Sequence, residues 1–168
     1  MNNKYEFTGE TLEYEGKTLH RIRALRDFGD VKAGEVGGWV ESEANLSHKN
    51  LAWISDNARV TDNARVSDNA RVSAAWVTDN ARVSGNARVS ATKDYCTCGP
   101  IGSRNDYTTV FRDSKLGVRV VCGCFSGSLD DFEKAVNKTH PYDQHGMEYR
   151  ALIALARIRF AYVFDEIT

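Results

Sequence analysis

The sequence predicts a mainly β protein: a short left-handed parallel β-helix of about three coils, with an N-terminal β cap and a C-terminal ββαα domain. Three observations predict it. A six-residue unit, D-N-A-R-V preceded by Ser or Thr, recurs with little change between residues 54 and 91. Strand-like stretches precede this array, and a β-hairpin pattern followed by two helical patterns comes after it. We therefore expect three parts: residues 1–38, 39–92 and 93–168.

The N-terminal segment is expected to form strands. The stretches YEFTG and TLEYEGKTLHRIRAL are rich in β-branched and aromatic residues, and Glu15-Gly16 is a candidate hairpin turn between them. A short solenoid exposes strand edges and interior at its ends unless other segments cover them. We therefore expect residues 1–38 to cap the first coil.

The repeat itself has the period of a solenoid. Aliphatic residues lie at positions 54, 60, 66, 72, 77, 83 and 89, and alanine precedes each of the last six by two residues. This spacing matches neither a helix nor a simple strand. It fits inward Ala and Val alternating with outward Arg and Ser or Thr, followed by an Asp-Asn corner at which Asn takes a left-handed backbone. Gly38-Trp39-Val40, followed by Ala44, is expected to form the entry coil.

Stacking of such coils predicts columns of outward side chains. Coils of about 18 residues place Arg65 beside Arg82 and Arg59 beside Trp76. They also place Trp53, Arg71 and Arg88 in one column. Stacked arginines repel one another, and we expect the corner aspartates and the tryptophans to relieve this. The face is then either a self-compensated, solvated surface or a binding face for a planar anion or a partner subunit.

The C-terminal segment lacks the six-residue repeat and has hairpin and helix patterns instead. YTTVFRDSKLGVRVVCGCF predicts a hairpin around a polar turn. SLDDFEKAV predicts a helix that begins after Ser128, with Asp131 in capping-box spacing and Leu129, Phe132 and Val136 on one face. GMEYRALIALARIRFAYVF predicts a second, longer helix. This ββαα unit is expected to dock on the end of the solenoid.

Composition excludes several classes of partner. The formal net charge is −1, so no basic field is present to bind a nucleic acid polymer. No apolar run has the length of a membrane span, and the first residues contain no apolar signal core. We expect a cytoplasmic protein whose four cysteines, Cys96, Cys98, Cys122 and Cys124, are reduced. Their C-x-C spacing is tighter than structural zinc sites prefer, so buried thiols are favoured over zinc.

Long stretches resemble a known family. The sequences LHRIRALRDFGDVKAGEVGGWVESEANLS, the D-N-A-R-V array, CGCFSGSLDDFEKAVNKTH and EYRALIALARIRF are similar to phage- and prophage-encoded hexapeptide-repeat proteins with left-handed β-helices. The similarity covers nearly the whole chain. It implies a viral accessory protein acting in the cytoplasm of an infected or lysogenic bacterium, and it implies no particular chemistry.

An enzymatic function is not indicated. Many left-handed β-helices are acyltransferases that use a histidine, but the array contains none after His48. The chain also lacks the G-x-S-x-G, H-E-x-x-H and phosphate-loop motifs. We therefore expect neither catalysis nor a cofactor, and acyl transfer is the least favoured alternative.

A candidate anion site lies in the C-terminal segment. The turn GPIGSRND offers glycine backbone N–H groups, a hydroxyl and a guanidinium, which suit a phosphate. Basic residues of the adjacent hairpin and aromatic or histidine side chains near the start of the last helix are expected to join it. The candidate ligand-binding residues are Gly102, Ser103, Arg104, Arg112, Lys115, Arg119, His140, His145 and Tyr149.

Two functions remain open. In the favoured one, a non-enzymatic phage protein sequesters a small anionic, nucleotide-like ligand, such as a host immune signal, to counter bacterial defence. In the other, the solenoid is a protein-binding module that blocks a host protein or joins a virion. The flat faces of a short solenoid also predict a homo-oligomer, a trimer ahead of a dimer.

Overall fold

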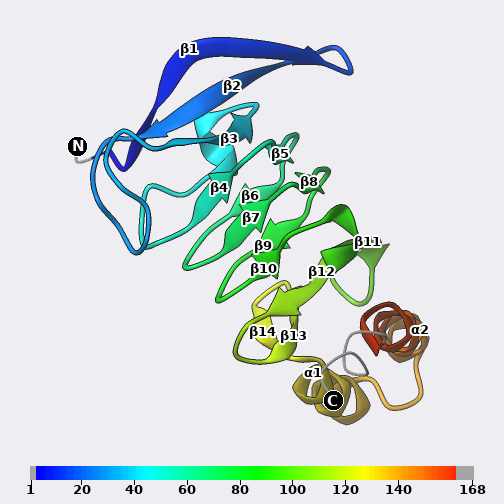
Figure 1. Cartoon of the computed structure of the whole chain (residues 1–168). Coiled ribbons are helices and arrows are strands. Elements are labelled where there is room, and N and C mark those ends of the chain that lie inside the picture. The colour runs from blue at the N-terminus through cyan, green and yellow to red at the C-terminus, as the bar shows by residue number, and fades with distance from the viewer. Residues whose placement is uncertain (1–2, 162–168) are drawn as a thin grey trace. The chain divides into compact units, whose positions relative to one another are not determined.

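The computed structural model of the chain describes residues 3–161, and it divides into two compact units at the Thr92–Lys93 bond (Figure 1). Sheets built mainly of short parallel strands make up the first unit, and an antiparallel sheet with two helices makes up the second. A 3-10 turn, Thr92–Asp94, carries the chain from one to the other.

The first unit opens with the predicted hairpin. Strand β1 (Tyr5–Tyr14) pairs antiparallel with β2 (Lys17–Ala24). Both turn residues have positive φ, 49° at Glu15 and 76° at Gly16, which confirms the predicted turn. Strand β2 pairs antiparallel with β3 (Val36–Val40), the first strand of the solenoid. The hairpin therefore covers the outer edge of that strand.

The repeats form short parallel strands that stack on three faces. The first face has the order β3-β5-β8, the second β4-β7-β10, and the third β6-β9, with Leu46 bridged in parallel to Val66. The strands are β4 (Trp53–Ser55), β5 (Arg59–Val60), β6 (Arg65–Val66), β7 (Arg71–Ser73), β8 (Trp76–Val77), β9 (Arg82–Val83) and β10 (Arg88–Val89). Arg65 pairs with Arg82, Arg59 with Trp76, and Arg71 with both Trp53 and Arg88, so the predicted columns are confirmed.

The interior has the predicted composition. Every repeat valine is at most 1% exposed and every repeat alanine at most 3%. Because alternate residues of a strand point to opposite faces, the Ala-x-Val spacing sends both side chains inward and the arginine between them outward. Burial of these small aliphatic side chains holds the coils together.

Two details of the coil differ from the prediction. The left-handed corner residue is the aspartate, not the asparagine: φ is 53° at Asp56, 58° at Asp62, 57° at Asp68 and 60° at Asp79. Gly85 occupies the same position with φ of 67°. Asp and Asn both tolerate this conformation, so residue type alone does not decide between them. Ala44 does not enter the interior, because a 3-10 turn (Glu43–Asn45) leaves it exposed and turns Asn45 inward.

Trp53 lies in its predicted outward column but is buried, at 2% exposure. The segment between β2 and β3 lies over it: the ring of Phe28 meets Trp53 edge-on at 5.4 Å, and a bridge between Phe28 and Val31 closes the segment. Asp30 from the same segment forms an ion pair with Arg71. This segment therefore shields one column of the solenoid.

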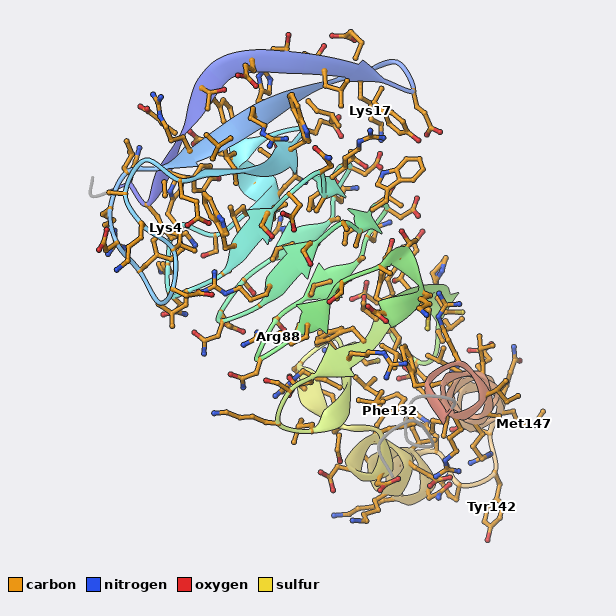
Figure 2. All side chains as sticks on the ribbon, in the orientation of Figure 1. Lys4, Lys17, Arg88, Phe132, Tyr142 and Met147 are labelled. Carbon is orange, nitrogen blue, oxygen red and sulfur yellow. The ribbon has the colours of Figure 1, made fainter. Side chains whose placement is uncertain are left out.

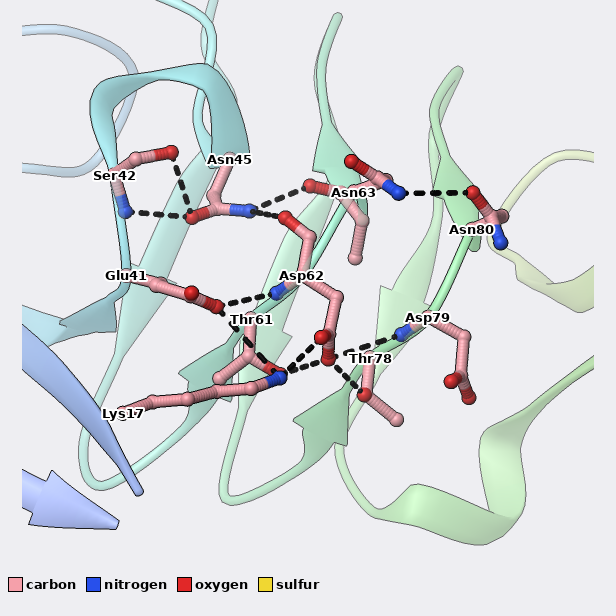
Figure 3. Close-up of polar contacts among 11 residues, drawn as sticks. Lys17, Glu41, Ser42, Asn45, Thr61, Asp62, Asn63, Thr78, Asp79 and Asn80 are labelled. Atoms are coloured by element: carbon pink, nitrogen blue, oxygen red, sulfur yellow. Dashed lines mark hydrogen bonds and ion pairs between the residues drawn. The ribbon is translucent and has the colours of Figure 1, made fainter. Parts of the chain in front are cut away.

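The N-terminal part also supplies partners for charged side chains of the solenoid, a role that was expected of the corner aspartates and the tryptophans. Arg59 lies over the ring of Tyr14 at 4.3 Å, and Arg21 lies over Trp39 at 4.9 Å. Asp62 instead pairs with Lys17, which follows the hairpin turn (Figure 3). The same aspartate accepts hydrogen bonds from the Thr61 and Thr78 hydroxyls at 2.9 and 2.7 Å. Side chains of the hairpin thus bind the outer surface of the solenoid.

The second unit contains four strands where the sequence predicted two. The hairpin β12 (Asp106–Asp113) and β13 (Gly117–Cys122) is confirmed, and β11 (Tyr95–Ile101) and β14 (Phe125–Ser128) flank it in the order β11-β12-β13-β14. Gly99-Pro100 lies within β11 and Gly127 within β14. Gly and Pro weaken the strand pattern and are tolerated at the sheet edges that these strands occupy.

Two helices pack on this sheet. Helix α1 (Leu129–Thr139) begins at Ser128, whose hydroxyl accepts the Asp131 N–H at 3.1 Å, as predicted. Helix α2 (Gln144–Ala161) is the longer one, and residues 162–164 of its predicted span lie outside the described residues. Nine buried residues form the core between sheet and helices: Val110, Val120, Phe132, Val136, Tyr149, Leu152, Ile153, Ala156 and Phe160. Neither described helix has the length and hydropathy needed to cross a membrane.

Candidate functional site

A pocket of about 230 Å³ lies at one end of the sheet in the second unit. Its wall comes from the β11–β12 turn, the β13–β14 turn, the inner face of α1, and α2. The lining residues are Ser103, Arg104, Cys122, Cys124, Phe125, Phe132, Ala135, Val136, Thr139, His140 and Tyr149. Four of the nine predicted site residues, distant in sequence, meet here: Ser103, Arg104, His140 and Tyr149.

The β11–β12 turn presents Ser103 and Arg104. The Asn105 N–H donates to the Gly102 carbonyl at 3.0 Å, and both end residues have positive φ, 72° and 49°. Arg104 extends toward the neighbouring β13–β14 turn, where its Nη1 would lie 3.2 Å from a β-carbon at Gly123. The guanidinium therefore extends from the β11–β12 turn to the β13–β14 turn at the edge of the pocket.

Tyr149 comes from α2 and closes one side. Its ring meets Phe132 edge-on at 5.4 Å, and its hydroxyl accepts a contact from the Cys122 Sγ at 3.8 Å. Burial, followed by the Cys122 contacts, raises the pKa of Tyr149 to about 12, although hydrogen bonds with Ser103 act in the opposite direction. The hydroxyl is therefore neutral at physiological pH and able to donate a hydrogen bond.

His140 follows the last turn of α1, and Asp143 holds it. The His140 Nδ1 lies 2.8 Å from an Asp143 carboxylate oxygen. The other Asp143 oxygen accepts the Gly146 N–H at 2.8 Å in the first turn of α2. The Gly146 hydrogen bond and then that of His140 lower the pKa of Asp143. The N-terminus of α2 is thus capped by the chain's own carboxylate.

Gly102 and His145 border the pocket without lining it. The Gly102 N–H donates to the Glu148 carboxylate at 2.6 Å, and this bond is the main reason that the pKa of Glu148 is lowered. The His145 ring stands edge-on to His140 at 5.7 Å, and its Nδ1 lies 3.9 Å from Glu148. A carboxylate from α2 therefore occupies the turn N–H that was expected to face an anion.

The three basic residues of the β12–β13 hairpin lie at its other end. The Arg112 Nε donates to Asp94 at 3.0 Å, and its guanidinium lies over the Phe160 ring at 5.3 Å. The Arg119 Nε donates to the buried Asp113 carboxylate at 2.6 Å. Lys115 is exposed in the intervening turn. The structure does not bring these residues to the pocket, because the hairpin separates its two ends by the length of a strand.

Sequence reasoning missed the aromatic wall. Phe125 and Phe132 lie 5.2 Å apart and both line the pocket. Phe132 was correctly placed on the inner face of its helix, but nothing in the pattern showed that this face also borders an open pocket. Phe125 was missed because its strand was missed.

The cysteines do not converge. Cys98 and Cys122 pair with the same residue, Thr108, from opposite sides of β12. Burial raises the pKa of the Cys96 thiol, and Cys124 is exposed. Among residues 3–161, no group of three or more His, Cys, Asp or Glu side chains is arranged to hold a metal ion.

A larger cavity, about 440 Å³, lies at the opposite end of this unit. Its wall is mostly apolar and includes Leu116, Val118, Leu129 and Phe160. The charged groups on it, Asp130 and Arg157, are 3.7 Å apart and compensate one another. This cavity offers a polar ligand little to bind, so the smaller pocket is the better candidate.

Comparison with known proteins concerns the first unit. The model of a family described as the YdcK beta solenoid repeat matches residues 52–67, 64–77 and 79–91. These segments are the stacked coils, and the chain is a β-solenoid repeat protein. No curated protein matches the chain. The matched segments include none of the residues that line the pocket.

Proposed function

We propose that the protein binds a small anionic, nucleotide-like ligand in the pocket of the second unit and holds it without chemical change. One observation carries this proposal: Ser103, Arg104, His140 and Tyr149, from three separate parts of the chain, line one pocket together with two phenylalanines. A few convergent polar groups on an apolar, aromatic wall are the usual features of a small-molecule site.

Arg104 supplies the preference for an anion. It is the one lining side chain with a permanent positive charge, and the planar guanidinium can bind a phosphate through two parallel hydrogen bonds. Ser103 and the neutral Tyr149 hydroxyl add donors on the same side. Phe125 and Phe132 offer ring faces or edges to a planar group.

The size of the pocket limits what it encloses. Sites that bury a whole drug-sized ligand have volumes of about 300–1,000 Å³, and this pocket has about 230 Å³. We therefore propose that it encloses one phosphate and the group next to it, while the rest of the ligand extends over the exposed turns.

The contacts within the pocket favour binding over conversion. An activated cysteine needs a neighbouring base or positive charge to form a thiolate. The contact of Cys122 is with the Tyr149 hydroxyl, whose raised pKa makes it a poor base. This contact supports storage of the ligand, which suits a phage accessory protein that removes a host immune signal.

The solenoid is proposed to be the rigid part of this protein. We infer a left-handed winding of about three coils, supported by the six-residue spacing and by the left-handed aspartates at four of the corners. In the alternative function, the outer surface of the solenoid would instead bind a host or virion protein.

Calorimetry against a panel of linear and cyclic nucleotides tests the proposal, together with native mass spectrometry of protein purified from a nucleotide-rich lysate. We expect at least one member of the panel to bind, and to be recovered intact after heat denaturation. A blank panel, together with a stable protein complex in a pull-down, would favour the protein-binding module. Recovery of a cleaved product would show an enzyme.

A further inference from the structure

Helix α2 is apolar on two sides. One side carries Leu152, Ile153 and Phe160 into the core of the unit. The other side leaves Met147, Leu155 and Ile158 at 62%, 50% and 68% exposure, with the exposed Ala151 and Ala154 between them. Figure 2 shows Met147 pointing away from the ribbon. Helix α1, in contrast, buries Phe132 and Val136 and exposes charged residues on its outer side.

The exposed residues have the spacing of a helix–helix contact. Positions 147, 151, 154 and 158 follow steps of four, three and four residues, which is the alternation that keeps a seam facing a partner helix. Large residues lie at the two ends of this stripe and alanines at its centre. Alanine allows two helix axes to approach closely, toward the short end of the usual range of about 8–10 Å.

The stripe is complementary to itself when reversed. A two-fold axis perpendicular to α2, midway between Leu152 and Ile153, sets Met147 against Ile158 of a second copy and Ala151 against Ala154 of that copy. Large side chains then meet at both ends and small ones meet at the centre. Such an isologous contact, in which one patch meets itself, is the commonest way in which identical chains associate.

The flanks of the stripe agree with the same arrangement. Glu148 and Arg159 lie on one flank, beside Leu155 of the stripe, and a perpendicular two-fold axis brings this flank against its own copy. Glu148 then lies within about one helical turn, 5.4 Å, of Arg159 of the second copy, so opposite charges face each other. Charged residues on both flanks also bind their own chain. Glu148 accepts the Gly102 N–H and Arg159 donates to the Lys93 carbonyl, while Arg150 and Arg157 on the other flank donate to His140 O and Glu133.

We propose that the exposed stripe of α2, made of Met147, Ala151, Ala154, Leu155 and Ile158, is the contact with a second copy of this chain, packed antiparallel about a two-fold axis. One helix face supplies the whole contact, so we expect it to bury less than a standard interface of about 1,600 Å² and the dimer to be weak and concentration-dependent. Tyr149 lies on the opposite side of the helix from this stripe, so the contact leaves the pocket open to solvent.

Opposite charges introduced at the two ends of the stripe test whether this surface is the dimer contact and whether the helices pair in the proposed antiparallel register. Met147→Glu alone and Ile158→Lys alone place a charge against an apolar side chain, and each is expected to weaken dimerisation roughly tenfold or more in sedimentation equilibrium. The double variant is expected to recover most of the affinity. The two positions are eleven residues apart on one helix, too far for an ion pair within one chain, so recovery requires the second copy.

Lys138→Glu, an exposed charge change on α1, is the control and should leave the dimer unchanged. A chain that stays monomeric into the sub-millimolar range would overturn the proposal. An oligomer insensitive to both single variants would overturn it as well, by placing the interface elsewhere. Weakening by the single variants without recovery in the double variant would reject the antiparallel register.

Discussion

The side chain of Tyr149 occupies the space that any β-carbon at position 102 would need. Gly102 has φ of 72° and donates its N–H to Glu148, one residue before Tyr149. The turn that carries Ser103 and Arg104 is therefore attached to α2 by both a hydrogen bond and close packing. This attachment sets the position of the turn relative to Tyr149, whose hydroxyl lies directly beside it.

Gly102→Ala is expected to destabilise the protein by more than its backbone strain alone. Alanine in a left-handed conformation costs about 1–2 kcal/mol, and the collision with Tyr149 adds the cost of overpacking, about 1–3 kcal/mol. Gly16→Ala is the matched control, because Gly16 has a similar φ of 76° and no neighbouring atom within 4 Å of its β-carbon position. Urea unfolding of both variants measures the difference, and equal losses would contradict the packing described here.

The inward and outward sides of the solenoid predict opposite sensitivities. Val66→Asp buries an unpaired carboxylate at a position that is 1% exposed, and should cost several kcal/mol. Arg65→Ser, at the adjacent exposed position, should cost less than about 0.5 kcal/mol. Similar losses in thermal melts would show that the assignment of the two sides is wrong.

The solenoid was the most predictable part of the fold, because one repeated pattern specifies one repeated geometry. Each Ala-Arg-Val step alternates inward and outward, so the columns that pair Arg65 with Arg82 and Arg59 with Trp76 followed from counting residues. The burial of Trp53 could not be predicted from the repeat. Its burial depends on Phe28, which comes from a segment without periodicity.

The candidate site was predictable in part. The Ser103-Arg104 turn and the aromatic or histidine residues near α2 were expected together, and His140 and Tyr149 do line the same pocket. The basic residues of the hairpin were misplaced because proximity in sequence was taken for proximity in space. Arg112 and Arg119 lie near the far end of the β12–β13 hairpin, where Asp94 and Asp113 bind them. Sequence pattern does not show which carboxylate neutralises which guanidinium.

The Lys17–Asp62 pair predicts a pH-dependent contribution to stability. The hydrogen bond from Lys17, and then that from Thr78, hold the pKa of Asp62 well below its usual range. The pair therefore stabilises the protein above the unfolded-state pKa of about 3.9, and this stabilisation is lost as the pH falls toward the lower folded-state value. Asp62→Asn should cost about 1 kcal/mol at neutral pH, and the difference from wild type should shrink in acid.

Asp56→Asn is the control for this change. Asp56 has the same left-handed corner conformation, with φ of 53°, and its contact with Ser55 is a hydrogen bond of 3.3 Å rather than an ion pair. Its effect on the free energy of unfolding should be smaller and less dependent on pH between neutral and acid conditions. Identical pH profiles for the two variants would contradict the role of Lys17.

Lys4 predicts a second dependence on pH, in the alkaline range. Its ammonium is buried and donates to the Ala52 carbonyl at 2.6 Å, and burial, followed by the charges of Arg26 and Arg71, lowers its pKa to about 8. Between this value and the unfolded-state pKa of about 10.4, the unfolded chain binds more protons, so stability should rise with pH. The slope should be absent in Lys4→Met. Parallel profiles of wild type and variant in urea unfolding would refute this.

Arg104→Ala is expected to separate binding from folding. A guanidinium that binds a phosphate makes charge-assisted hydrogen bonds worth about 1.5–3 kcal/mol each, so removal should weaken nucleotide binding roughly ten- to a hundredfold. The melting temperature of the free protein should change little, because Arg104 is exposed on its turn. Arg65→Ala, which removes another exposed arginine, on the solenoid, should leave binding unchanged. Calorimetry with a nucleotide that binds the wild-type protein measures both variants, and equal affinities would remove the pocket of the second unit as the binding site.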